Sequence, residues 1–165
     1  MRIHIVAGHG RGQTALSAFD AALAEAGILN YNLSHLSSII PPGSTVEVVK
    51  RYDAPEDDYG KMLYLVIAEI RSDVLGKTIG AGLGWYQWGD GRGVFAEHTE
   101  ITDNPDAEVL EADLRRKVER TIQDLCDFRH VPFDARQLNA RFATNRVSDE
   151  PACALVAAVY KAQGF

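Results

Sequence analysis

The sequence has few cysteines and no excess of basic residues. Only two cysteines occur among its 165 residues, and Cys126 and Cys153 lack the paired spacing of a zinc site or a disulfide framework. We therefore expect two buried thiols and no metal site. With 17 basic and 23 acidic residues, the net charge of -6 opposes binding to nucleic acid or to an anionic membrane surface. A small cationic substrate suits this charge better.

Long hydrophobic runs and targeting signals are also missing from the sequence. No apolar stretch approaches the roughly 20 residues that a membrane-spanning helix needs. The first six residues are followed at once by glycines and Arg11, which is unlike a secretory signal. We therefore expect a soluble, cytoplasmic protein. A hydrophobic content of 46% in 165 residues is enough for one well-packed domain, residues 1–165.

The pattern of apolar residues predicts a mixed α/β domain. Short alternating or continuous apolar runs favour strands, whereas apolar residues at helical spacing favour helices. The predicted strands cover residues 3–7, 33–38, 46–51, 62–70, 94–98, 137–147 and 152–160. The predicted helices cover residues 14–26, 79–86 and a long segment that starts at Asn104-Pro105 and carries Leu110, Leu114, Val118, Ile122 and Leu125. Residues 53–58 are predicted to form an exposed acidic loop.

The glycine-rich segment of residues 8–12 predicts a turn that opens the first helix. Thr14 is the expected N-cap, and Gly27 is expected to end the helix. Because backbone amides at a helix N-terminus bind phosphate, a nucleotide site is one hypothesis. The segment nevertheless lacks the later glycine of a dinucleotide fingerprint and a following Gly-Lys-Ser/Thr. Nucleotide chemistry therefore stays an alternative.

Residues 32–43 place two adjacent serines shortly before a double proline. Pro41 and Pro42 cannot donate backbone hydrogen bonds, so they end the strand and put Ser37 and Ser38 at a fixed corner. Such a corner can hold a strained peptide bond, which the Ser38 hydroxyl could attack at the Ser37 carbonyl. Elimination of the resulting ester would leave a carboxylate on Ser37 and a pyruvoyl group at position 38. The alternative is a plain turn whose hydroxyls bond nearby backbone groups.

Several linked motifs accompany this corner in a fixed order: Gly-Gln-Thr-Ala-Leu-Ser-Ala-Phe-Asp-Ala-Ala-Leu at 12–23, Ala-Gly-Ile at 26–28, Asn-Tyr-Asn-Leu at 30–33, and Ser-Ser-Ile-Ile-Pro-Pro-Gly at 37–43. In this order and spacing the chain resembles the pyruvoyl-dependent arginine decarboxylase family. The resemblance implies a four-layer αββα sandwich that cleaves itself into a β chain, residues 1–37, and an α chain, residues 38–165. It also implies a trimer or a pair of trimers with active sites between subunits.

The resemblance assigns roles to five residues. Ser38 becomes the pyruvoyl precursor and Ser37 the residue whose carboxyl is released. Asp20 meets the guanidinium of arginine, for which a carboxylate is the natural bidentate partner. Glu97 returns a proton to the decarboxylated carbon, as a carboxyl whose pKa is raised by burial would do at neutral pH. Asn32 holds a carbonyl or a carboxylate in place.

Two of these roles have alternatives in the sequence itself. Asp20 is also compatible with a solvent-facing position on its helix. Glu100 lies close enough to be the matching position in place of Glu97, and a glutamate at a strand edge can simply pair with a lysine or an arginine. Geometry is needed to separate these possibilities.

Together these implied roles predict decarboxylation of arginine to agmatine and carbon dioxide through a Schiff base with the covalent pyruvoyl group, without metal or pyridoxal phosphate. One departure bears on the substrate, because Leu29 stands where the family often has glycine before Asn-x-Asn. A bulkier side chain there would reshape the pocket, so histidine or another amino acid is an alternative substrate. The alternative outside enzymes is a non-catalytic trimeric binding module, in which Ser38 is never converted.

Overall fold

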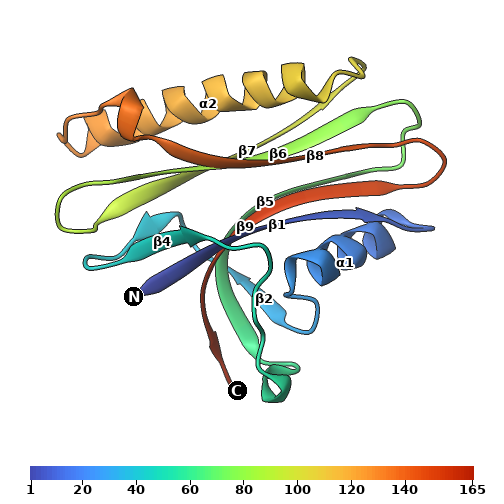
Figure 1. Cartoon of the computed structure of the whole chain (residues 1–165), viewed down its shortest axis with the longest axis horizontal. Coiled ribbons are helices and arrows are strands. Elements are labelled where there is room, and N and C mark those ends of the chain that lie inside the picture. The colour runs from blue at the N-terminus through green and yellow to red at the C-terminus, as the bar shows by residue number, and fades with distance from the viewer.

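The computed structural model describes residues 1–165 and has four layers, a helix, two sheets and a second helix (Figure 1). One sheet has five strands in the order β2-β5-β9-β1-β4, and the other has four in the order β3-β7-β6-β8. The first comprises β1 (Arg2–Arg11), β2 (Asn32–His35), β4 (Thr45–Val48), β5 (Met62–Ser72) and β9 (Ala152–Gln163). The second comprises β3 (Ile39–Ile40), β6 (Thr78–Gln87), β7 (Gly93–Thr102) and β8 (Asn139–Arg146).

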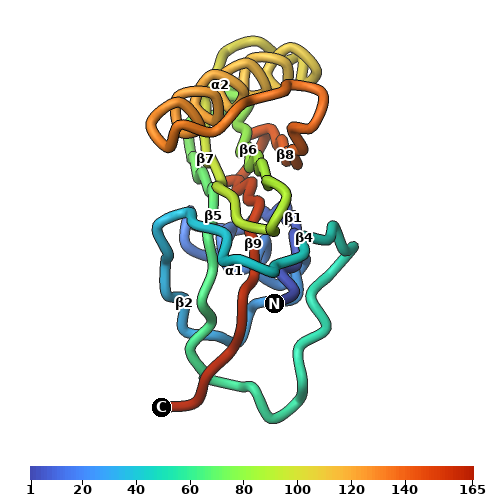
Figure 2. Tube along the Cα trace, turned by 90° about the vertical axis from the view of Figure 1, so that its left-hand side faces the viewer, coloured from blue at the N-terminus to red at the C-terminus, as the bar shows by residue number.

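The two helices, α1 (Ala15–Ala26) and α2 (Ala107–Phe128), cover the outer faces of the two sheets. Short 3-10 turns occur at Glu56–Asp58 and Ala135–Gln137. In the view turned by 90°, α2 and the four-stranded sheet stack over the five-stranded sheet, and both termini lie on the side away from α2 (Figure 2). The αββα architecture implied by the resemblance is confirmed. Neither helix has the combination of length and apolar composition that crossing a membrane requires.

The largest core lies between the two sheets. Ile3 and Ile5 of β1 meet Leu83 and Phe95 of the opposite sheet there, all fully buried. Because side chains on a strand alternate between its faces, Val6 of β1 instead packs under α1. Each sheet is therefore apolar on both faces, which explains why several strands read as continuous apolar runs.

The first helix begins and ends as the sequence predicts, but the segment before it does not form a turn. The Thr14 side chain accepts a hydrogen bond from the Ser17 amide, and Gly27 ends the helix in the left-handed conformation with φ of 85°. The predicted turn over residues 8–12 is wrong, because β1 continues to Arg11 and pairs with β9. All three glycines of this segment, at positions 8, 10 and 12, lie against α1 and its backbone, so the helix occupies the space beside them.

Close packing of α1 on β1 leads to the first testable prediction. A Cβ atom at Gly10 would overlap the carbonyl oxygen of Ala18, and this backbone atom cannot move aside cheaply. We expect Gly10→Ala to lower the free energy of unfolding by about 1–3 kcal/mol, measured by urea denaturation. Gly89→Ala is the matched control, since no heavy atom lies within 4 Å of its Cβ position. Equal stability of the two variants would show that α1 packs less closely than described.

Residues 79–86, predicted as a helix, belong to β6, so this prediction is wrong. Nine of the ten residues of β6 are buried, because the strand is covered by the other sheet on one face and by α2 on the other. Its glycines face α2, where a Cβ at Gly80 would lie 2.9 Å from Leu114 Cδ1 and one at Gly84 would overlap Val118. A strand without a polar face has no alternation, and its apolar density resembled that of a buried helix.

The second helix begins slightly later than predicted. Asp106 is its N-cap and accepts a hydrogen bond of 2.9 Å from the Glu108 amide, so Pro105 precedes the cap and is not the first helical residue. The predicted buried stripe is confirmed at Leu110, Leu114, Val118 and Ile122. Leu125 is only partly buried.

The remaining strands and the cysteines agree with the sequence in outline. The predicted strand at 46–51 ends earlier, at Val48, and the other strands differ from their predicted bounds by a few residues. Both cysteines are free, buried thiols, as predicted. Burial raises the pKa of the Cys153 thiol to about 12, which makes it a poor nucleophile at neutral pH.

Candidate active site

Ser37 and Ser38 lie where the chain passes from one sheet to the other. β2 ends at His35 and pairs with β5 in the five-stranded sheet, whereas β3 begins at Ile39 and pairs with β7 in the four-stranded sheet. The prediction of one strand that ends near Ser38 is therefore wrong. The prolines directly after β3 end that strand, and the serine pair occupies the crossing between the sheets.

The backbone of Ser38 is strained. Its φ of 60° falls in the left-handed region, a conformation that costs a residue with a side chain about 1–2 kcal/mol. Among non-glycine residues only His130 shares a positive φ. The Ser38 carbonyl oxygen is fixed by a hydrogen bond of 2.9 Å from the Phe95 amide. The strained residue therefore directly follows the Ser37-Ser38 peptide bond, which is the bond predicted to be cleaved.

Glu97 of β7 reaches the same corner. The Ser38 hydroxyl donates a hydrogen bond of 2.6 Å to Glu97 Oε1. A carboxylate at this distance is placed to accept the hydroxyl proton, which would make the oxygen a better nucleophile. Glu97 was expected to be buried, but its side chain is exposed on the single chain.

The two candidate glutamates point in opposite directions. Residues three apart on a strand lie on opposite faces, so Glu100 faces α2, where its Oε2 is 2.8 Å from Lys117 Nζ. His98 shares that face and lies 2.8 Å from Thr121 Oγ1, and burial followed by the charge of Lys117 lowers its pKa. Glu100 is therefore the glutamate paired with a lysine, and Glu97 is the one beside the serine.

Tyr160 of β9 also contacts the corner, although no motif in the sequence singles it out. Its hydroxyl donates a hydrogen bond of 2.8 Å to the Ile39 carbonyl oxygen, and its ring packs edge-on against Phe95 at 6.2 Å between centroids. Burial, and then the charge of Glu97, raise the pKa of Tyr160 above its usual range. In the sequence, Tyr160 is the last residue of the alanine-rich run 152–160, which predicts a core strand and no role at a site.

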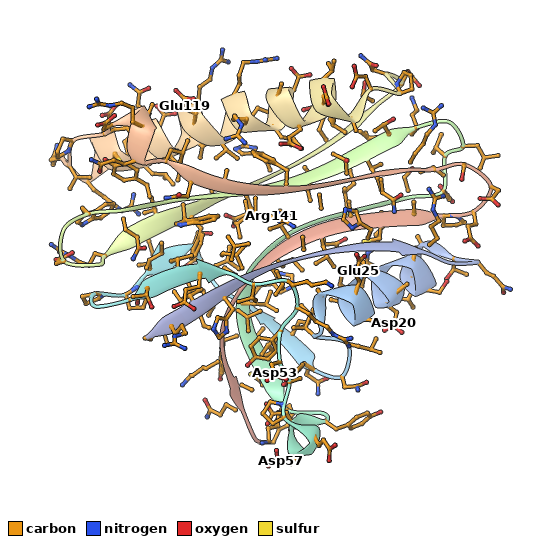
Figure 3. The ribbon with its side chains drawn as sticks, viewed as in Figure 1. Asp20, Glu25, Asp53, Asp57, Glu119 and Arg141 are labelled. Carbon is orange, nitrogen blue, oxygen red and sulfur yellow. The ribbon has the colours of Figure 1, made fainter.

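Asp20 and Asn32 both line a separate hollow of about 410 Å³. Asp20 is exposed on α1, above the loop that carries Asp53 and Asp57 in Figure 3. The side-chain nitrogen Nδ2 of Asn32 donates a hydrogen bond of 2.7 Å to the Gly60 carbonyl oxygen. Leu29, the residue that departs from the family pattern, lies in the wall of this hollow.

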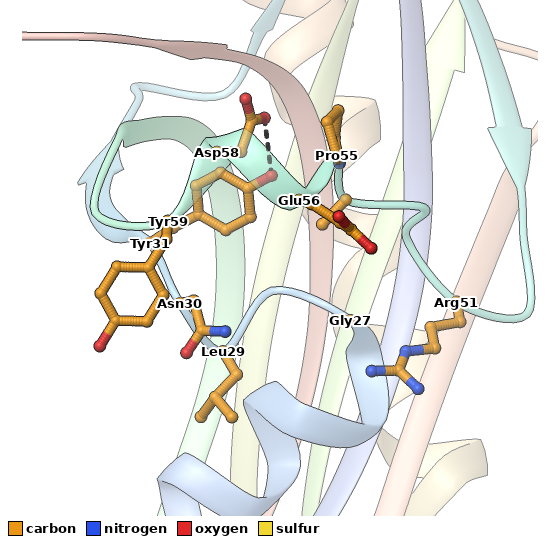
Figure 4. Close-up of a pocket in the computed structure, with 10 residues that line it drawn as sticks. Gly27, Leu29, Asn30, Tyr31, Arg51, Pro55, Glu56, Asp58 and Tyr59 are labelled. Carbon is orange, nitrogen blue, oxygen red and sulfur yellow. Dashed lines mark hydrogen bonds between the residues drawn. The ribbon is translucent and has the colours of Figure 1, made fainter.

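A buried carboxylate supports the wall of the hollow. Asp58 accepts hydrogen bonds of 2.6 Å from Lys61 and 2.8 Å from the Tyr31 hydroxyl, and these two contacts lower its pKa. Figure 4 shows the bond from Tyr31 in an adjoining pocket, which shares Leu29 and Tyr31 with the hollow. The predicted exposed loop is confirmed for residues 53–57, whereas the prediction is wrong for Asp58, which is only 8% exposed. Tyr31 also lines the hollow, so this cluster fixes the chain between Asp20 and Asn32.

The structure therefore divides the five predicted site residues into two groups. Ser37, Ser38 and Glu97 gather at the crossing between the sheets, whereas Asp20 and Asn32 line the hollow beside α1. None of the first three residues lines that hollow. No group of three or more histidine, cysteine, aspartate or glutamate side chains is arranged to hold a metal ion.

Comparison with known proteins agrees with the resemblance seen in the sequence. The sequence model of the family described as "Pyruvoyl-dependent arginine decarboxylase (PvlArgDC)" matches residues 2–164. A protein of that name from Thermococcus kodakarensis is 33% identical over 160 residues, which is 96% of this chain and 93% of the relative.

Two further relatives of the same name match over shorter stretches. The one from Thermoplasma volcanium is 40% identical over 83 residues, and the one from Halobacterium salinarum is 37% identical over 106 residues. These matches cover 50% and 64% of this chain, and they span only 45% and 64% of those two relatives. The match of the family model over nearly the whole chain is decisive. The chain belongs to the pyruvoyl-dependent arginine decarboxylase family.

Proposed function

We propose that this protein cleaves itself at Ser37-Ser38 and then decarboxylates arginine to agmatine and carbon dioxide. The observation that carries the proposal is the hydrogen bond of 2.6 Å from the hydroxyl of strained Ser38 to Glu97. The names of the relatives support pyruvoyl dependence and arginine as the substrate. The acidic net charge of -6 is compatible with a cationic substrate.

The cleavage follows from the groups at the corner. Glu97 accepts the hydroxyl proton of Ser38, Oγ attacks the carbonyl carbon of Ser37, and the peptide C–N bond breaks as its nitrogen takes up a proton. Loss of the α-proton of residue 38 then breaks its Cβ–Oγ bond and leaves a carboxylate on Ser37. The dehydroalanine formed at position 38 reacts with water, releases ammonia and becomes the pyruvoyl group. The products are chains of residues 1–37 and 38–165.

The residues around position 38 fit a pyruvoyl group. The atoms of Ser38 supply it, the Phe95 amide holds the adjoining carbonyl oxygen, and Glu97 lies beside the side chain. When formed, the group supplies an electrophilic carbonyl that captures the substrate amine and withdraws electrons from the bond to the departing carboxylate. Glu97 is placed to hold a proton next to this position and to deliver it to the substrate carbon.

We further propose that the complete site forms between copies of this chain, in a trimer or a pair of trimers. Two observations support this assembly. The arginine-binding candidates Asp20 and Asn32 lie in a hollow separate from Ser38, and Glu97 and Ile39 beside the serine corner are exposed on the single chain. A neighbouring copy would cover the exposed corner and bring its own hollow to it.

Asp20 is the residue expected to bind the substrate cation. Because Asp20→Asn removes the charge that pairs with the guanidinium, we expect the KM for arginine to rise about 10- to 100-fold, the equivalent of one charge-assisted hydrogen bond. The change is measured by steady-state kinetics on fully processed protein, whose kcat should change little. Glu25→Gln on the same helix is the control, since Glu25 contacts His9 and does not line the hollow. An unchanged KM would mean that Asp20 is only a solvent-facing acid.

The substrate is tested by incubating processed protein with arginine, lysine, ornithine and histidine separately, and measuring carbon dioxide release together with the amine product. Arginine should be consumed fastest and yield agmatine. Faster consumption of histidine would make the arginine assignment wrong and would point to Leu29 as the residue that reshapes the pocket.

A further inference from the structure

We propose that Tyr160 is a positioning residue for self-cleavage, which holds the serine corner in its strained conformation through the hydrogen bond to the Ile39 carbonyl. The inference rests on the proposed function and assigns a further residue to it. It starts from the irregular pairing of β9, the strand that carries Tyr160.

Tyr160 is the extra residue of a β-bulge. Along β5 and β9, Leu65 pairs with Val159 and Tyr64 pairs with Lys161, so Tyr160 has no partner in β5. A bulge bends a strand and changes the face to which the following side chains point, and bulges are frequent beside active sites. Here Tyr160 packs with the core between the sheets, whereas Ala162 beyond the bulge packs on the α1 side. The alternation of β9 thus continues as far as Tyr160, which faces the serine corner, and the bulge changes the face of the strand only beyond this residue.

The corner has few other restraints. β3 has only two residues and pairs with β7 alone, at the edge of the four-stranded sheet. The Phe95 amide holds the Ser38 carbonyl at 2.9 Å, and Tyr160 holds the next carbonyl, that of Ile39, at 2.8 Å. These bonds come from different sheets, so the corner is tied to both sides of the sandwich. Without the Tyr160 bond, the backbone at Ser38 is freer to relax from its left-handed conformation.

The tyrosine is suited to act as a permanent donor. It is partly buried against Phe95 and stands close to the carboxylate of Glu97. Both surroundings keep the phenol protonated, since they raise its pKa. The hydroxyl hydrogen is therefore available to the Ile39 carbonyl at neutral pH.

The test measures self-cleavage of freshly made full-length chain by intact mass spectrometry at successive times. Tyr160→Phe removes one oxygen and leaves the ring in place, and we expect its cleavage to be about 10-fold slower than that of the wild type, as for the loss of one hydrogen bond of typical strength. Tyr64→Phe is the control, because Tyr64 and Tyr160 both line a further hollow of about 350 Å³ beside Ser37, and the Tyr64 hydroxyl makes no hydrogen bond within the chain. Its cleavage rate should equal that of the wild type.

A second variant separates positioning from general stability. With 4-aminophenylalanine at position 160, the amine again offers a donor to the Ile39 carbonyl, and we expect most of the cleavage rate to return. A Tyr160→Phe chain that is cut at the wild-type rate, or a slow one that the amine does not rescue, would overturn the role of Tyr160 and leave the proposed function standing. A wild-type chain that is never cut would overturn the proposed function, and the role of Tyr160 with it.

Discussion

Replacement of Ser38 by alanine should leave a single uncut chain with no decarboxylase activity above background. The variant lacks the hydroxyl that attacks the Ser37 carbonyl, so no pyruvoyl group can form at position 38. Because the protein then has no electrophile to capture the substrate amine, we expect a loss of about 10⁶-fold or more in turnover, comparable with the whole enzymatic acceleration. Intact mass spectrometry and product assays on the same preparation measure both consequences.

Ser37→Ala is the matched control for this experiment. Ser37 contributes its carbonyl carbon to the cleavage, and its exposed side chain makes no hydrogen bond within the chain. We therefore expect this variant to be cut after residue 37 and to remain active. Cleavage of the Ser38→Ala chain between residues 37 and 38 would contradict the account of how the bond breaks.

Replacement of Glu97 by glutamine should produce the second large effect. Glutamine keeps the shape of the side chain but can neither accept the Ser38 hydroxyl proton as a base nor return a proton to the substrate. We expect kcat to fall by about 10²- to 10⁴-fold, the usual contribution of a general acid or base, and self-cleavage to slow as well. Rates are divided by the fraction of chain that mass spectrometry shows to be cut, so that the two defects are measured separately.

Glu100→Gln tests whether the assignment of the glutamate is right. Glu100 lies on the opposite face of β7 and pairs with Lys117 of α2 at 2.8 Å. As an ion pair of this kind contributes little to stability, this variant should fold and work nearly as the wild type does. If Glu100→Gln were the inactive variant and Glu97→Gln the active one, the geometry at the serine corner would have been misinterpreted.

Local features of the sequence were enough to locate the serine corner but not to describe it. The ring of each proline fixes its own backbone angle, and this effect needs no tertiary contact, so a strand end directly before Pro41 was predictable. The passage from one sheet to the other depends on the pairing of β3 with β7, whose residues lie more than 50 positions further along the chain. No local pattern encodes that pairing.

The choice between the two glutamates shows a similar limit. The sequence predicted a strand over 94–98, but β7 extends to Thr102, and alternation along it places Glu97 and Glu100 on opposite faces. The helix α2 covers one face of β7, and its Lys117 donates a hydrogen bond to Glu100 there. The opposite face, which carries Glu97, is therefore the one that meets Ser38. The sequence therefore reduced the problem to two residues, and the packing of a distant helix resolved it.

Three features had no usable signal in the sequence. β6 is covered on both faces, so it lacked the polar alternation that distinguishes a strand from a buried helix. Asp58 is buried only because Tyr31 and Lys61 supply its hydrogen bonds. Tyr160 contacts the Ile39 carbonyl only because β3 of the other sheet passes beside it, and this approach cannot be read from the pattern of β9 alone.

The central claim is that the chain makes its own pyruvoyl group at position 38, and intact mass spectrometry under denaturing conditions tests it most directly. The account predicts two chains, residues 1–37 and 38–165, the second with the mass of a pyruvoyl terminus and blocked to N-terminal sequencing. A single chain of 165 residues that stays uncut after long incubation would contradict the account, and a non-catalytic binding module would then be the better description.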